Sequence, residues 1–274
     1  MIEPRTALDA VGALPDGEID VAGAALQLAR IDLPEADWRA AEARLSGIAR
    51  DAVAAAAGVN PGDPPAQAAV LANLLAGRLG FAGDDETSDD LANANLIRVI
   101  ERRRGLPVAL GILWLHAAQA AGWAAHGIDF PGHFLLGLGG ARAPAVIDPF
   151  SGGQLLDMAA LHALLQRVEG GGAQLRTPLF APMTARDVLL RLQNNIKWRR
   201  YHAGDVAGAI ACTRDMLRIA PLEPGQWWDL AMLQAEHGLI ALALRSLIRF
   251  SELAPAEEAR RAKAVMDELR SRLN

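Results

Sequence analysis

His133 and Asp148 are the residues whose types and spacing are best suited to catalysis. They stand 15 positions apart, in the segments Pro-Gly-His-Phe and Ile-Asp-Pro-Phe. An imidazole beside a carboxylate can take the proton of a thiol and complete a Cys-His-Asp triad. The one cysteine of the sequence, Cys212, lies far downstream in a different kind of segment. The pattern therefore holds the base and the acid of a triad without its nucleophile, which favours binding over bond cleavage.

The composition is that of a folded, globular protein. Of 274 residues, 51% are hydrophobic and 22% are charged, and the net charge is -5. No long basic run is present, so we expect no nucleic-acid partner. We predict a cytoplasmic protein with no membrane partner. The residues near Met1 are charged, where a signal peptide would be apolar, and a single cysteine cannot form an internal disulfide. The apolar run at 108–121 is too short to span a bilayer. We also expect no cofactor.

The first part of the chain predicts an α+β domain over residues 1–178. Apolar residues recur at helical spacing, and Pro107 is well placed as the first residue of a helix. A glycine-rich turn at 137–140 separates two short strand candidates. Helices are predicted over 19–57, 66–79, 91–103 and 107–121, and strands over 125–130, 134–138 and 145–147. Helices followed by short strands indicate a small antiparallel sheet.

Residues 179–274 predict an all-α domain with an internal repeat. A glycine, an alanine and a proline each recur at the same interval, which is the tetratricopeptide period, in the roles of turn, close helix packing and helix end. The pairs are Gly204 and Gly238, Ala209 and Ala243, and Pro221 and Pro255. We expect two TPR-like repeats and a capping helix, because repeats need a polar cap.

One helix face in this domain is a candidate peptide-binding surface. Arg191, Asn194, Trp198 and Tyr201 have the spacing i, i+3, i+7 and i+10, so they share a face. The alternative is that this face packs against the first domain. Cys212 has the surroundings of a small, buried hydrophobic residue.

Four segments carry a resemblance to a known family. They are residues 95–107 (Asn-Leu-Ile-Arg-Val-Ile-Glu-Arg-Arg-Arg-Gly-Leu-Pro), 130–135, 147–153 and 189–195. With them the chain resembles the bacterial transglutaminase-like/TPR family, the YchA-like or "Sir B" proteins, over nearly its whole length. The resemblance implies a transglutaminase-like fold with a papain-like core, followed by the TPR-like domain.

The resemblance also implies positions for the triad. In active members a cysteine begins a helix and a glycine ends it, and counting the typical length of that helix back from Gly122 gives Pro107. The histidine and the acid fall on His133 and Asp148. Proline carries no nucleophile, and residues 105–111 offer no Ser, Thr, Cys or Lys in its place. The site would then be vestigial, with Asn95 and Arg104 as residues of its wall.

These observations predict a pseudoenzyme, a non-catalytic protein- or peptide-binding or scaffold protein. The alternative is a weak amidase or peptidase in which His133 activates water and Asp148 orients it. A purely structural role for the pair, ordering the sheet, also stays open. Binding of a carboxylate at the start of the 107–121 helix, beside His133, also stays open.

We expect no metal at His116, His126, His133 and Asp148, because their spacing fits no ligand pattern. Arg98 and residues 102–104 are interpreted as a solvated helix face, balanced by acids between 84 and 90.

Overall fold

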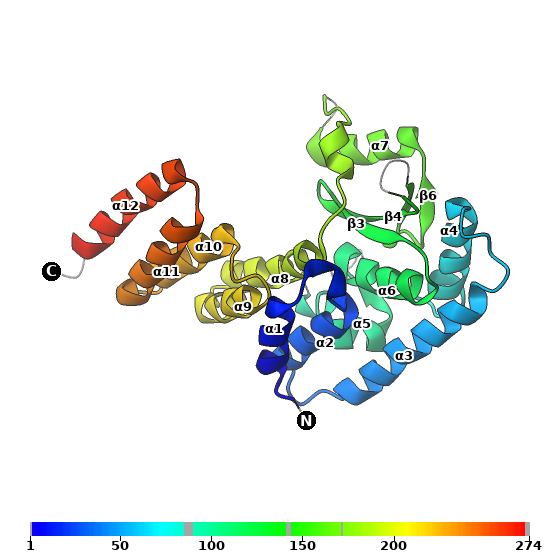
Figure 1. Cartoon of the computed structure of the whole chain (residues 1–274), viewed down its shortest axis with the longest axis horizontal. Helices are drawn as coiled ribbons and strands as arrows, with labels where there is room; N and C mark the ends of the chain where they lie inside the picture. The colour runs from blue at the N-terminus through cyan, green and yellow to red at the C-terminus, as the bar shows by residue number, and fades with distance from the viewer. Residues whose placement is uncertain (1, 85–89, 141–143, 171, 272–274) are drawn as a thin grey trace. The chain divides into compact units, whose positions relative to one another are not determined.

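The computed structural model describes residues 2–84, 90–140, 144–170 and 172–271 (Figure 1). It divides into two compact units. The central unit is Pro15–Leu192, and the helical unit combines Met1–Leu14 with Gln193–Asn274. This division differs from the predicted boundary at residue 178 in two ways. The helical unit begins within a continuous helix, and it includes an N-terminal helix that the sequence assigned to the first domain.

Helices supply most of the regular structure in the described part of the central unit. Asp20, Asp37, Asp63 and Asp157 each precede a helix and accept a hydrogen bond from a first-turn backbone amide. These caps fix where the helices begin. The predicted helix over 19–57 forms as two helices with a turn at residues 33–37. The helices are α2 (Val21–Asp32), α3 (Trp38–Ala55), α4 (Pro64–Ala72), α5 (Leu96–Arg102), α6 (Pro107–Ala120), α7 (Met158–Glu169) and the first part of α8 (Ala185–His202).

Short helical segments connect these helices. A π-helix continues α4 and completes the predicted helix over 66–79. The others are single 3-10 turns. The π-helix is Asn73–Arg78, and the 3-10 turns are Asp16–Glu18, Leu91–Asn93 and Thr177–Phe180.

A four-stranded antiparallel sheet lies in the central unit, with strand order β3-β4-β5-β6. The three predicted strands are confirmed, and β6 and a two-stranded parallel pair, β1 and β2, are additional. The strands of the sheet are β3 (Ala125–Phe130), β4 (His133–Leu138), β5 (Ala145–Asp148) and β6 (Gln154–Leu156). The pair consists of β1 (Ala82–Gly83) and β2 (Arg104–Gly105).

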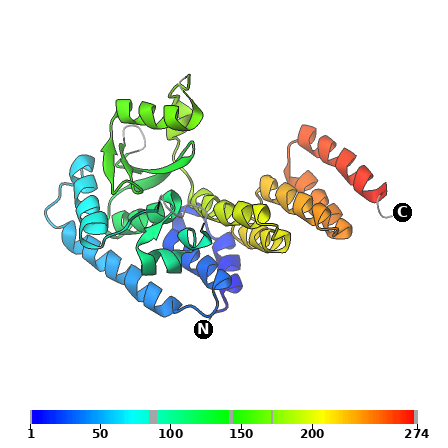
Figure 2. The same cartoon turned by 180° about the vertical axis from the view of Figure 1, so that it is seen from behind.

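Helices α6 and α7 cover opposite sides of this sheet, as both views of the chain show (Figure 1, Figure 2). On the α6 side, Gly111 gives room to the Phe134 ring, because a Cβ there would stand 2.2 Å from a ring carbon. On the α7 side, Leu135 and Val146 form a core with Leu161 and Leu165. Since alternate residues of a strand face opposite sides, β4 contributes to both cores.

The helical unit contains two successive helix pairs, α8 with α9 and α10 with α11. Gly204 and Gly238 turn the chain between the helices of each pair with φ of 81° and 77°, where glycine is favoured. Ala209 and Ala243 are fully buried between helices. The elements are α1 (Pro4–Ala13), the second part of α8, α9 (Val206–Ile219), α10 (Pro224–Glu236), α11 (Ile240–Leu253) and α12 (Ala256–Ser271).

Helix α1 packs against α9, although their paired residues Arg5 and Asp215 are 210 positions apart in the sequence. Two ion pairs join them, Arg5 to Asp215 at 2.9 Å and Arg218 to Asp9 at 2.8 Å.

Within the described part of the chain, no helix combines the length and the apolarity needed to cross a bilayer.

Candidate functional site

His133 and Asp148 meet at one end of the sheet. His133 is the first residue of β4 and Asp148 the last of β5, and these strands are antiparallel neighbours. The start of one strand therefore lies beside the end of the other. The imidazole Nε2 is 2.9 Å from the Asp148 Oδ1. The structure thus brings together the two residues that the sequence singled out.

The Asp148 carboxylate is fixed by further hydrogen bonds. The backbone N–H of Phe150 donates to Oδ1 at 2.9 Å, and the Ser151 hydroxyl donates to Oδ2 at 2.7 Å. Burial alone would raise the pKa of Asp148, but the hydrogen bond and charge of His133 and the hydrogen bonds of Ser151 outweigh it, so the pKa is lowered. The carboxylate is therefore held in its charged form.

This charged acid decides the hydrogen-bonding state of His133. A carboxylate only accepts, so Nε2 must donate, and in the neutral ring Nδ1 then carries the lone pair. The side chain is 14% exposed, and its ring meets the Phe150 ring edge-on with centroids 5.7 Å apart. Chemically, the arrangement is an oriented imidazole with one basic nitrogen.

Phe150 links this pair to the segment that leads into α6. Its carbonyl accepts from the Gly83 N–H at 3.1 Å, and a Cβ at Gly83 would stand 2.6 Å from the Phe150 ring. Gly83 pairs in turn with Gly105, just before Pro107. Pro107 begins α6 as predicted, with no side-chain cap before it. The segment before Pro107, where the nucleophile was expected, is thus linked through Gly83 and Phe150 to the His133–Asp148 pair. It contains no thiol.

The two expected wall residues have structural contacts. Asn95 is buried and caps α5, accepting from the N–H groups of Ile97 and Arg98 and donating to the Ala29 carbonyl at 3.1 Å. Its hydrogen bonds all go to the backbone, so it holds α5 against α2. The Arg104 guanidinium is exposed and donates to the carbonyls of Gly80 and Arg103.

Arg191 also makes contacts with the sheet. Its Nη2 donates to the His133 carbonyl at 2.9 Å, and its Nη1 pairs with Asp129. Because Asp129 lies near the end of β3, close to the turn into β4, Arg191 fastens the hairpin that presents His133. For this residue the structure favours packing over peptide binding. Sequence reasoning could not find this role, since it depends on residues far away along the chain.

The remaining residues of the predicted face belong to the helical unit. Trp198 is 46% exposed and lies edge-on to Tyr201, with centroids 5.7 Å apart. A hydrogen bond to the Glu236 carboxylate raises the pKa of Tyr201. Lys197 is buried and pairs with Asp229 on α10. Asn194 is partly buried. Trp198 and Tyr201 form an aromatic surface on α8.

Other candidates have ordinary structural surroundings. No three His, Cys, Asp or Glu side chains of the described residues converge as a metal site. His116 bonds to the Leu45 carbonyl, and burial lowers the pKa of His126. Cys212 is buried, as predicted, and its thiol donates to the Gln193 side chain at 2.9 Å.

The arginines at the end of α5 and directly after it are exposed, and those of α5 have acidic partners, as interpreted from the sequence. Arg102 pairs with Asp84 at 3.1 Å and Asp90 at 2.9 Å, and Arg98 pairs with Glu101. Residues 85, 86 and 89 lie outside the described residues.

Comparison with known proteins gives a consistent result. Residues 39–194 match the family model of the transglutaminase-like superfamily. A UPF0162 protein of Xylella fastidiosa (strain Temecula1) is 29% identical over 195 residues, covering 70% of this chain and 69% of that protein. A UPF0162 protein of Vibrio cholerae is 27% identical over 236 residues, covering 86% of each. No solved structure matches the chain.

Proposed function

Because the chain belongs to the transglutaminase-like superfamily and α6 begins with proline, we propose that it is a non-catalytic protein- or peptide-binding protein. The observation that carries the proposal is the ordered His133–Asp148 pair in a central unit without cysteine. A base can activate only a nucleophile that is present, and removing a triad nucleophile costs many orders of magnitude in rate.

Side chains that could replace the missing thiol are occupied elsewhere. The Ser151 hydroxyl donates its hydrogen to Asp148, the acid of the pair, and not to the imidazole. The Cys212 thiol is buried in the helical unit and bonded to Gln193. These contacts support a binding role for the fold.

The helical unit supports the binding part of the proposal. Its two helix pairs each turn at a glycine, and these glycines are separated by the tetratricopeptide interval, which supports the proposal that they are TPR-like repeats. Stacked repeats of this kind create extended surfaces for protein segments. The exposed Trp198 and its neighbour Tyr201 give this unit an aromatic surface of the type enriched in interfaces.

A second candidate function is weak hydrolysis of amides or peptides with water as the nucleophile. The observation in its favour is the His133 imidazole itself, which is oriented through Nε2, basic at Nδ1 and partly exposed. General-base catalysis by such a group contributes a factor of roughly 10²–10⁴.

Two assays separate these functions. The first follows hydrolysis of fluorogenic peptide amides by the wild type and by His133→Ala. We expect the wild type to hydrolyse no faster than buffer. A rate above buffer that is lost in His133→Ala would establish the hydrolase and remove the binding-only assignment.

The second assay restores the missing group with Pro107→Cys in a Cys212→Ser background. If the vestigial geometry is intact, His133 lowers the pKa of the new thiol. Alkylation by iodoacetamide at about pH 6 should then be roughly 10-fold faster than in the matched variant that also carries His133→Ala. Equal rates in the two variants would mean that Pro107 does not occupy the nucleophile position.

A further inference from the structure

A groove in the helical unit is formed by side chains from four helices. From α9 into the turn that follows it, and again along α11, the lining positions follow i, i+3, i+4 and i+7, so each stripe faces one way. The groove encloses about 820 Å³. We call it the arginine groove, and its lining is Asp9, Gly12, Ala13, Arg214, Leu217, Arg218, Pro221, Trp227, Leu230, Gln234, Leu242, Arg245, Ser246 and Arg249.

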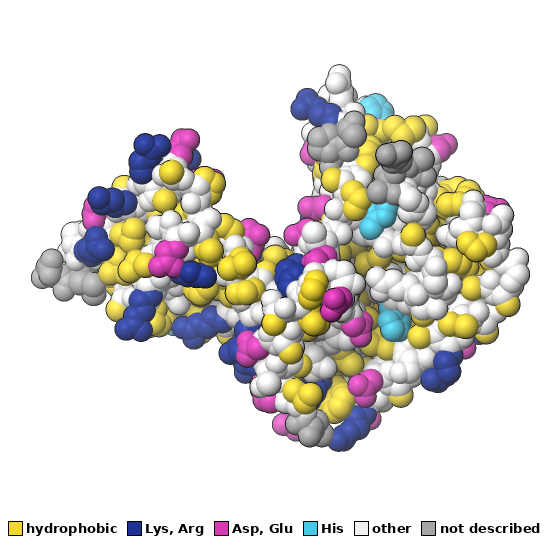
Figure 3. Space-filling view, viewed as in Figure 1, with side chains coloured by type: hydrophobic (Ala, Val, Ile, Leu, Met, Phe, Trp, Pro, Cys, Tyr) yellow, Lys and Arg dark blue, Asp and Glu magenta, His cyan; other side chains and the backbone are white. Residues whose placement is uncertain are grey.

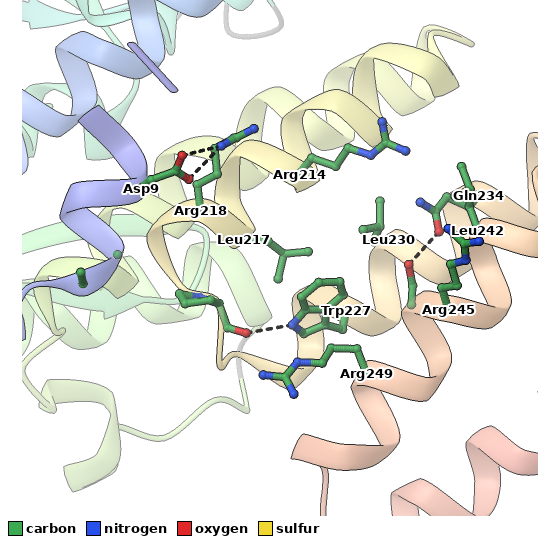
Figure 4. A pocket seen from close by; sticks show the side chains of 14 residues that line it. Asp9, Arg214, Leu217, Arg218, Trp227, Leu230, Gln234, Leu242, Arg245 and Arg249 are labelled. Carbon is green, nitrogen blue, oxygen red and sulfur yellow. Dashed lines mark hydrogen bonds and ion pairs between the residues drawn. The ribbon is translucent and has the colours of Figure 1, made fainter. Parts of the chain in front are cut away.

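The floor of the arginine groove is apolar. Leu217, Trp227 and Leu230 lie at its centre, with the arginines placed around them (Figure 4). The indole N–H of Trp227 donates to the Pro221 carbonyl at 2.9 Å, so the only polar atom of this side chain is already satisfied. The polar groups of Gln234 and Ser246 bond to each other at 2.8 Å. An incoming apolar side chain would therefore displace no hydrogen bond of the floor.

The rim has an excess of positive charge. Four arginines and one acid, Asp9, line the groove. Arg218 pairs with Asp9, and Arg249 pairs with Glu252. Arg214 and Arg245 are exposed and have no ion pair or hydrogen bond with the described residues. On the face seen in Figure 3, Lys and Arg side chains gather over the C-terminal helices among hydrophobic ones.

Helix α1 shows which kind of helix can pack on this side of α9. It forms one wall of the groove and is joined to α9 by the ion pairs Asp9–Arg218 and Arg5–Asp215. Gly12 lets its backbone come close, since a Cβ there would stand 2.1 Å from the Arg218 carbonyl oxygen. An amphipathic helix with a carboxylate at its edge thus packs on α9 and forms one wall of the groove. A segment of the same chemistry suits the open part of the groove.

We propose that the arginine groove binds a short acidic, amphipathic segment of a partner protein. Its apolar side chains would cover Trp227 and Leu230, and its carboxylates would pair with Arg214 and Arg245. This inference rests on the proposed binding function and names its site and partner class. The site is separate from the aromatic surface on α8, because the groove takes its lining from α1, α9, α10 and α11.

The test measures binding of fluorescein-labelled helical peptides, four turns long, to the full chain by fluorescence polarisation. The probe carries leucine and glutamate on opposite faces of a helix. One control peptide replaces each glutamate by lysine, and another replaces each leucine by serine. We expect the probe alone to bind, with a Kd of about 10–100 µM, which rises with salt as charges are screened.

The protein variants locate the site. Arg214→Glu with Arg245→Glu should weaken probe binding at least about 10-fold, because opposed charges become like charges. The matched control is Arg260→Glu with Lys263→Glu on α12, which makes the same change of net charge at exposed positions away from the groove. It should change binding less than about twofold.

Three results would overturn the inference: no probe binding at about 100 µM protein, equal binding of the lysine peptide, or equal loss in both protein variants. None of them alters the hydrolysis and alkylation results, which concern the central unit. Conversely, hydrolysis dependent on His133 would remove the non-catalytic assignment without changing binding at the groove. The two proposals therefore fail separately.

Discussion

The His133–Asp148 pair and the arginine groove differ in how far their polar atoms are already engaged. At the pair, both carboxylate oxygens and the imidazole Nε2 have protein partners, and the carboxylate side chain is only 6% exposed. At the groove, Arg214 and Arg245 project from exposed positions with no partner among the described residues. The pair has the residue types of an active site, whereas the groove has groups left over for a ligand.

This difference predicts that substitutions at the two sites have different effects. His133 and Asp148 fulfil much of their hydrogen-bonding capacity within the fold, so replacing them should mainly affect stability. Arg214 and Arg245 have no ion pair or hydrogen bond with the described residues, so replacing these two arginines should mainly affect binding. Measuring the free energy of unfolding of variants at both sites tests this distinction.

The largest effect is expected for Asp148→Ala. The change removes the partners of the His133 imidazole, the Phe150 N–H and the Ser151 hydroxyl together. Because these part-buried groups would all lose their partner, the change should lower the free energy of unfolding by about 2–4 kcal/mol. Urea denaturation followed by circular dichroism measures the loss.

Asp157→Ala is the matched control, because Asp157 is exposed and makes one capping bond, to the Ala160 N–H. Loss of a cap costs about 1 kcal/mol. If Asp148→Ala cost no more than Asp157→Ala, the pair would not be the ordered structural element described above.

A smaller effect concerns pH and His126. Burial lowers the pKa of His126, and its Nε2 is buried with no hydrogen-bond partner among the described residues. The folded state thus binds the proton less well than the unfolded state, whose histidine pKa is about 6.5. Stability is therefore lost as the pH falls through and below that value.

We expect the urea midpoint of the wild type to fall between about pH 7.5 and pH 5.5, and His126→Gln to fall less. The lowered pKa of Asp148 changes stability only near pH 4 and below, which is outside this pH interval. An identical pH dependence in the variant would show that the buried imidazole does not couple folding to protons.

The smallest effect on stability is expected at the arginine groove. Arg214→Glu with Arg245→Glu alters two exposed side chains, and exposed substitutions usually change stability by less than about 0.5 kcal/mol. The urea midpoint should match that of Arg260→Glu with Lys263→Glu. A loss above about 1 kcal/mol would mean that these arginines stabilise the fold and are not reserved for a ligand.

Local patterns in the sequence predicted a large part of the fold. The strand over 125–130 and the helix beginning at Pro107 formed as expected, because alternation and a proline at a helix start are local signals. The glycines at 204 and 238 occupy equivalent turns. Asn95 could have been identified too, since an asparagine directly before a helical apolar run is a typical cap.

Contacts between distant residues were beyond such patterns. Nothing near Arg191 in the sequence indicates that it binds the His133 carbonyl, 58 positions away. The arginine groove likewise exists only when side chains from four helices come together. The assignment of α1 to the helical unit depends on ion pairs with α9 and has no local signal.

The separation between α1 and α9 has a consequence for synthesis. Arg5 and Asp215 are 210 positions apart, so at about 5–20 residues per second α1 waits roughly 10–40 s for its partner. A lone helix as short as α1 is marginal in water. The central unit ends at Leu192, so its last residue is made 23 positions before Asp215, about 1–5 s earlier at the same rate. The middle of this protein is thus synthesised in full before its first helix has α9 to pack against.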